Sequence, residues 1–149
     1  RDMKHRVIFL IIALITATSA FAQEGMAVNK LFTSDYKQRP SVNEVEISGM
    51  VLKSYGVTKF RSITAINDAE VADIMRRCVA ADAPKAIGSE VKKVGGVINY
   101  ALYTFSEKEG KYRYVFYRNR KKGDGKKEVT VLYVEGTATL KELKDLFKK

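Results

Sequence analysis

Histidine and cysteine are scarce in this chain, and their scarcity excludes several kinds of chemistry. The 149 residues contain one histidine, His5, one cysteine, Cys78, and no tryptophan. His5 lies in an N-terminal segment that we expect to be removed, which leaves a mature domain without the usual general base and the commonest metal ligand. Ser-His-Asp triads, Cys-His pairs and ordinary zinc sites are therefore excluded from that domain. We predict no catalytic residue, no metal site and no cofactor.

The single cysteine is predicted to be structural. Cys78 has no second cysteine with which to form an intramolecular disulfide. It recurs with Val71, Ile74, Met75 and Val79 at helical spacing, in one apolar stripe. A thiol buried in such a stripe behaves as a small hydrophobic group, and its thiolate is disfavoured. We therefore expect no nucleophilic or redox role for Cys78.

Long hydrophobic runs are also missing, apart from one near the N-terminus. The apolar run Val7–Ile15 is far shorter than the roughly 20 residues that cross a bilayer as a helix. Basic residues precede it, and the small-residue cleavage signal Ala20–Ala22 follows it. These features predict a secretory signal peptide that is cleaved between Ala22 and Gln23. No cysteine follows the small residues, so we expect no lipid anchor.

The predicted cleavage divides the chain into two parts. Arg1 and Asp2 precede Met3, the expected initiator, so residues 1–22 are assigned to two added residues and the signal peptide. Residues 23–149 are predicted to form a single secreted domain, because this length suits one domain with a substantial core. The expected location is the periplasm or the extracellular space.

Basic residues outnumber acidic ones, and this excess of positive charge indicates which partners the domain could bind. Lys plus Arg number 27 and Asp plus Glu number 17, and removal of residues 1–22 takes these to 24 and 16, leaving a net charge of +8. Such a charge attracts anionic surfaces at long range. Export separates the protein from cytoplasmic nucleic acid, so envelope proteins, anionic glycans and lipid headgroups become the expected partners.

The first half of the expected domain combines helical and strand patterns. Apolar spacing in "MAVNKLFTSDYK" predicts a short helix that ends before Pro40. Alternation in "SVNEVEISG" and "KFRSITAIND" predicts two strands, and a helical turn is one interpretation of "MVLKSYGV" between them. Asn67 and Glu70 form a capping box that begins a strong helix. Pro84 interrupts this helix, and "KAIGSEVKKVGG" is expected to continue it irregularly.

The second half has the pattern of an antiparallel meander. Three apolar, aromatic and β-branched runs, "VINYALYTF", "KYRYVFYRN" and "EVTVLYVEG", are joined by charged, glycine-containing turns. Thr139 and Glu142 then form a second capping box, and Leu140, Leu143 and Phe147 give the last helix an apolar stripe. The sequence therefore predicts an α+β fold with a mainly antiparallel sheet of about five strands and helices packed on one face.

Side-chain alternation divides the middle strand of this meander into two faces. Tyr114 and Phe116 share one face, and Arg113 and Tyr117 share the other. If the first pair meets the helices, Arg113, Tyr117 and Tyr103 lie on an exposed face that could bind a flat or anionic partner. We favour the alternative, a well-packed sheet with amphipathic tyrosines at its margin.

The same strand partly matches the RNA-binding motif K/R-G-F/Y-G/A-F-V-x-F/Y. When Val115 is aligned with the valine of the motif, Lys111 and Arg113 stand where the motif has small residues that let bases approach. Specific binding of nucleic acid is therefore not expected. The six basic residues from Arg118 to Lys127 flank a turn and would discourage edge-to-edge pairing. Any contact surface is predicted to consist of Arg113, Tyr117, Arg118, Arg120, Lys121 and Lys122.

The order of elements resembles that of small secreted families of unknown function from Bacteroidota. The resemblance rests on the layout of "LFTSDYK", "VNEVEISG", "SITAIND", "AEVADIMRRC" and the meander, and above all on the closing "VEGTATLKELKDLF". It covers most of the mature chain. It implies an exported α+β domain and brings no established activity, so it assigns no catalytic residue.

Three functions are compatible with these observations. The first, which we favour, is a non-enzymatic periplasmic or surface interaction domain that binds a protein partner or anionic ligand through the outer sheet face and the basic hairpin. The second is a binder of anionic polymers or surfaces, such as glycans, lipid headgroups or nucleic acid, whose binding would weaken steeply with salt. The third is an enzyme that uses the carboxylates Glu44 and Glu46, or Asp68 and Glu70, if either pair converged in a pocket.

Overall fold

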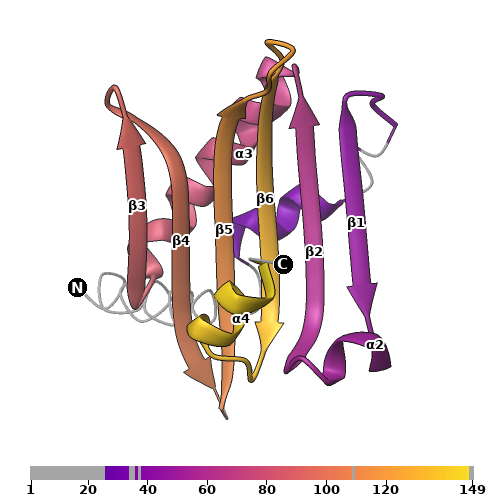
Figure 1. Ribbon diagram of the computed structural model, residues 1–149, viewed down its shortest axis with the longest axis vertical. Coiled ribbons are helices and arrows are strands. Elements are labelled where there is room, and N and C mark those ends of the chain that lie inside the picture. The colour runs from indigo at the N-terminus through magenta and orange to yellow at the C-terminus, as the bar shows by residue number, and fades with distance from the viewer. Residues whose placement is uncertain (1–25, 34–35, 37, 109, 148–149) are drawn as a thin grey trace, which may run out of the picture.

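Six strands form a single antiparallel sheet in this computed structural model, which describes residues 26–33, 36, 38–108 and 110–147. The strand order is β1-β2-β6-β5-β4-β3 (Figure 1). The strands are β1 (Val42–Ser48), β2 (Val57–Ile66), β3 (Gly88–Val94), β4 (Val97–Lys108), β5 (Lys111–Lys121) and β6 (Lys127–Gly136). The helices are the 3-10 helices η1 (Ala27–Phe32) and η3 (Ala83–Lys85), and the α-helices α2 (Met50–Lys53), α3 (Ala69–Asp82) and α4 (Leu140–Phe147).

The predicted sheet of about five strands is wrong because β3 is a sixth strand. The segment expected to continue the preceding helix instead pairs with β4 over Gly88–Val94. Gly95 and Gly96, with φ of +59° and +80°, form the turn that joins the two strands. All seven residues of β3 are exposed, so its sequence lacks the apolar alternation that marks a half-buried strand.

The prediction of helices on one face is also wrong, because helices cover both faces of the sheet. Figure 1 shows α3 and η1 behind the sheet and α4 in front of it. The core behind the sheet includes Val71 and Met75 of α3 together with Val131 of β6. The core in front of the sheet includes Leu143 of α4, Tyr114 and Val134. The central strands are therefore buried on both sides, as the four consecutive buried residues from Tyr114 to Tyr117 show.

Helix α3 begins one residue later than the predicted capping box. The N-cap is Asp68, whose Oδ1 accepts a hydrogen bond from the backbone N–H of Val71 at 3.1 Å. Asn67 precedes the cap with φ of +53°, a conformation that asparagine tolerates better than most residues. The Ser41 hydroxyl donates to Asp68 at 2.7 Å, and this bond, the bond from Val71 and the nearby Arg39 together lower the pKa of the Asp68 carboxyl. The cap thereby links α3 to the residue before β1.

The predicted apolar stripe of α3 is confirmed. Val71, Met75 and Val79 are buried against the sheet, and Ile74 and Cys78 are partly buried beside them. Burial raises the pKa of the Cys78 thiol, with a smaller contribution from the Asp82 carboxylate. The protonated, weakly nucleophilic form of this thiol is therefore favoured.

The second predicted capping box begins α4. The backbone N–H of Glu142 donates to the Thr139 hydroxyl at 3.3 Å, and that hydroxyl donates to the Glu142 carboxylate at 3.1 Å. Leu143 is buried under the helix. The Tyr114 hydroxyl donates to the carbonyl oxygen of Ala138 at 2.8 Å, which fixes the segment that leads from β6 into α4. Helix α4 covers the lower ends of β4, β5 and β6 in Figure 1.

Candidate functional site

Three basic side chains converge on one buried carboxylate near the tip of the β5–β6 hairpin. The Glu128 carboxylate lies 3.0 Å from Arg120, 3.1 Å from Lys122 and 3.7 Å from Arg118. The antiparallel register explains the cluster, because Glu128 of β6 stands directly opposite Arg120 of β5. Side chains two residues apart on a strand share a face, so Arg118 and Lys122 reach the same carboxylate.

The cluster carries an excess of positive charge at the surface. The Glu128 side chain is 9% exposed, whereas those of Arg118, Arg120 and Lys122 are 50%, 47% and 36% exposed. Burial acts to raise the pKa of the Glu128 carboxyl, but hydrogen bonds and charges from Lys122 and Arg120 outweigh it and hold the pKa below its ordinary value. Glu128 is therefore ionised at neutral pH, and one negative charge faces three positive ones.

Glu128→Gln is expected to destabilise the protein at neutral pH by roughly 1–3 kcal/mol, because Arg120 and Lys122 lose a charged hydrogen-bond acceptor and Arg118 loses an ion pair. A carboxyl whose pKa is lowered by folding contributes stability above its unfolded pKa and loses it as pH falls through the folded pKa. The difference between the two proteins should therefore shrink below about pH 4.5, the ordinary pKa of this group. Urea unfolding of wild type and Glu128→Gln from pH 7 to pH 3 measures this difference in the free energy of unfolding. A difference that stays constant over this range would contradict the role of Glu128 as an ionised acceptor.

The sequence-predicted contact set does not form one surface. Arg118, Arg120 and Lys122 lie together on the face that α4 partly covers, whereas Arg113, Tyr117 and Lys121 alternate to the opposite face. Arg113 lies 3.8 Å from Glu135, toward the other end of β5.

The exposure expected for Tyr117 and Tyr103 in one of the two interpretations is wrong. Tyr117 is 4% exposed and Tyr103 is 7% exposed, because both pack on the side of the sheet that α3 and η1 cover. A single strand shows which residues share a face, but it does not show that a second helix covers the other face.

Besides Glu128, the structure adds two residues to this surface that sequence reasoning missed. Tyr100 of β4 stands opposite Arg118, and Lys92 of β3 stands opposite Tyr100. The Lys92 ammonium lies 6.0 Å from the centre of the Tyr100 ring, within the range of a cation–π contact. We call the five residues Lys92, Tyr100, Arg118, Arg120 and Lys122 the basic face.

The basic face lies on the part of the sheet that α4 leaves open. In Figure 1, α4 stands in front of the lower strand ends, and no element that the structure describes stands in front of the upper halves of β4, β5 and β6. Thr64 of β2 and Thr130 of β6 continue this surface, with their hydroxyls hydrogen-bonded to each other at 3.1 Å. The surface is thus polar and rich in hydrogen-bond donors. It could bind an anion or an acidic partner.

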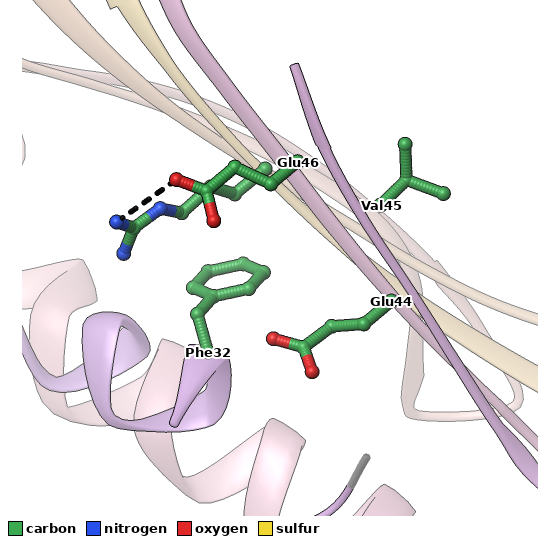
Figure 2. Close-up of a pocket in the computed structure, with 5 residues that line it drawn as sticks. Phe32, Glu44, Val45 and Glu46 are labelled. Atoms are coloured by element: carbon green, nitrogen blue, oxygen red, sulfur yellow. Dashed lines mark ion pairs between the residues drawn. The ribbon is translucent and has the colours of Figure 1, made fainter. Parts of the chain in front are cut away.

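The first carboxylate pair considered in the sequence lines a small pocket of about 90 Å³ with Phe32 and Arg61 (Figure 2). Glu46 lies 3.3 Å from Arg61, and the Arg61 guanidinium lies 5.8 Å from the centre of the Phe32 ring. One Glu44 oxygen is buried without a hydrogen-bond partner among the residues that the structure describes. Because Arg61 neutralises Glu46, the two carboxylates do not act as a like-charged pair. The pocket suits a few water molecules.

The second carboxylate pair considered in the sequence, Asp68 and Glu70, makes contacts that stabilise the fold. Asp68 caps α3, and Arg39 lies 3.3 Å from it and 3.2 Å from Glu70. Over the described part of the chain, no cluster of three or more His, Cys, Asp or Glu side chains could hold a metal ion. None of the described helices combines the length and apolar character needed to cross a membrane.

Fold and surface together define a small antiparallel α+β domain with helices on both sides of the sheet and an open basic face. The chain belongs to a family of unknown function, DUF6108, whose match extends over residues 15–147. The expectation of a family of unknown function is thereby confirmed. A comparison with curated proteins gave no match.

Proposed function

We propose that this protein is an exported, non-enzymatic interaction domain that binds an acidic protein partner in the cell envelope through the basic face. Export is supported by the basic, apolar and small-residue segments of residues 4–22. The layout of the chain supports an origin in Bacteroidota. The observation that carries the proposal is the convergence of Arg118, Arg120 and Lys122 on the single carboxylate Glu128, on a part of the sheet beyond α4.

The arrangement favours binding of an acidic partner for two reasons: the cations attract the partner, and they are already held in position. Glu128 restrains the three cations next to it, so less side-chain entropy is lost when they meet an acidic partner. Tyr100 adds a half-buried aromatic ring beside Lys92, and aromatic and arginine side chains are enriched at protein interfaces. A partner with carboxylates and one apolar contact would complement this surface.

The proposal is tested by capture from an envelope extract with the tagged protein. Arg118→Gln with Arg120→Gln removes two charges from the basic face while Lys122 continues to neutralise Glu128. Lys111→Gln with Lys141→Gln is the matched control, because it makes the same change in net charge at exposed positions outside the basic face. We expect wild type and control to capture a discrete protein at moderate salt, and the Arg118 and Arg120 variant to lose it. Equal capture by all three proteins would contradict the proposal.

A second candidate function is binding of an anionic polymer. It is favoured by the continuation of the basic residues around the hairpin tip, where Lys126 and Lys127 follow Lys122 and are exposed. Binding of this kind falls steeply with salt concentration, because condensed counterions are released. Bulk anionic material that salt removes equally from wild type and from both variants would support this function and contradict the first. An enzyme is not proposed, since Arg61 and Arg39 neutralise Glu46 and Glu70.

A further inference from the structure

A groove of about 340 Å³ lies between α3 and the β3–β4 hairpin, on the side of the sheet opposite the basic face. This size falls at the lower end of the range of about 300–1,000 Å³ that is typical of small-molecule sites. The groove is lined by Arg76, Val79, Ala80, Lys93, Gly96, Val97, Ile98, Ala101, Tyr103 and Tyr117.

Most of the groove lining is apolar and comes from regular secondary structure. Val79 of α3 and Ala101 of β4 are 5% and 0% exposed. Val97 is 58% exposed and extends the apolar lining toward solvent. Elements of the sheet and the longest helix supply these residues, so the lining does not depend on a long loop. A ligand with an apolar body would gain free energy by displacing water from it.

Two cations stand among the lining residues. Lys93 forms no ion pair with any residue that the structure describes. Arg76 lies 2.7 Å from Asp73, but the same carboxylate also accepts Arg77 at 2.5 Å. One carboxylate is therefore shared between two guanidinium groups, and the groove carries a net positive charge.

Two tyrosines add hydrogen-bond donors beside these cations. The hydroxyls of Tyr103 and Tyr117 form no hydrogen bond with a described residue, although both side chains are more than nine-tenths buried. Burial raises the pKa of both hydroxyls, so they stay protonated at neutral pH. Neither oxygen is a fully buried atom without a partner, so both hydroxyls reach solvent and can donate to a ligand oxygen that enters the groove.

We propose that this groove binds a small organic anion with an apolar body, such as a medium-chain carboxylate. Arg76 and Lys93 attract the carboxylate, the tyrosine hydroxyls donate to its oxygens, and Val79, Val97 and Ala101 contact the chain. Neutral lipids lack the charge that these cations complement, and organic cations are repelled by it. The groove is separate from the basic face, so this proposal does not depend on whether that face binds a protein.

The test uses decanoate as the probe, with binding followed by amide chemical shifts in the full protein. Shifts should concentrate on α3, β3 and β4. Ala80→Trp fills the groove from an exposed position of α3 and should abolish binding, whereas Ala81→Trp, on the same helix but outside the lining, should leave it unchanged. Binding that survives Ala80→Trp, or shifts scattered over the whole surface, would overturn the proposal.

The role of the two cations is tested by a charge-matched pair of variants. Arg76→Gln with Lys93→Gln should weaken decanoate binding by about tenfold or more, the loss expected for charged hydrogen bonds. Lys53→Gln with Lys85→Gln removes the same charge from exposed residues outside the groove and should change affinity much less. Decanol should bind wild type at least about tenfold more weakly than decanoate. Equal effects of the two variants, or equal affinity for decanol, would refute recognition of an anion.

Discussion

Replacing Asp82 with alanine is expected to lower the free energy of unfolding by roughly 2–5 kcal/mol. Asp82 is 1% exposed at the end of α3, and its two carboxylate oxygens accept the backbone N–H groups of Ala27 and Val28 at 2.8 and 2.9 Å. These donors open η1, where a helix has no internal acceptors for its N–H groups. Without the carboxylate, two backbone donors lose their partner and η1 loses its link to α3.

Urea unfolding of wild type, Asp82→Ala and Asp82→Asn would measure this effect. Asp82→Asn keeps one acceptor oxygen but turns an amide NH₂ toward the second donor, so an intermediate loss is expected. Asp145→Ala is the control, because Asp145 is exposed on α4 and its loss should cost no more than about 0.5 kcal/mol. A loss at Asp82 no greater than that at Asp145 would show that the carboxylate does not hold η1.

Gly136→Ala is expected to destabilise the protein by roughly 3 kcal/mol or more, because the sheet leaves no space for a methyl group. A Cβ at this position would lie 2.1 Å from the carbonyl oxygen of Gly56 and 2.8 Å from Cα of Val57. Both contacts are to backbone, so relief would require β2 and β6 to separate where Val57 pairs with Gly136. The segment that leads into α4 would move with them.

Gly123→Ala provides the matched control for this prediction. A Cβ at Gly123, in the hairpin tip, would have no atom within 4 Å, and its φ is not positive. It should therefore be neutral within about 0.5 kcal/mol. Thermal unfolding of the two variants compares the same chemical change with and without a steric cost. A Gly136→Ala protein as stable as Gly123→Ala would mean that β2 and β6 are not this close.

Local sequence patterns were sufficient to predict most of the helices and strands. The three runs of the meander became β4, β5 and β6, and the stripe that includes Val71 and Met75 became α3. These segments have strong hydrophobic patterns: α3 buries one face and shows a helical period, whereas the central strands are buried on both faces and show nearly continuous apolar and aromatic runs. β3 was missed because an edge strand with exposed side chains has neither pattern, and only its pairing with β4 makes it a strand.

The candidate site was predicted only in part. Three of its cations, Arg118, Arg120 and Lys122, were identified from the charge of the hairpin. Glu128 was not, because its importance depends on the register that places it opposite Arg120. Lys92 was not either, since it comes from β3 and joins the surface through Tyr100.

The sequence by itself determined the basic charge, the helical stripe of α3, the meander and the scarcity of histidine and cysteine, because these are properties of composition and local period. Only the tertiary structure decided that helices cover both faces of the sheet, that Tyr117 is buried and that Arg118, Arg120 and Lys122 share one carboxylate. The physical reason is that alternation assigns side chains to two faces, whereas the packing of distant segments decides which face meets water.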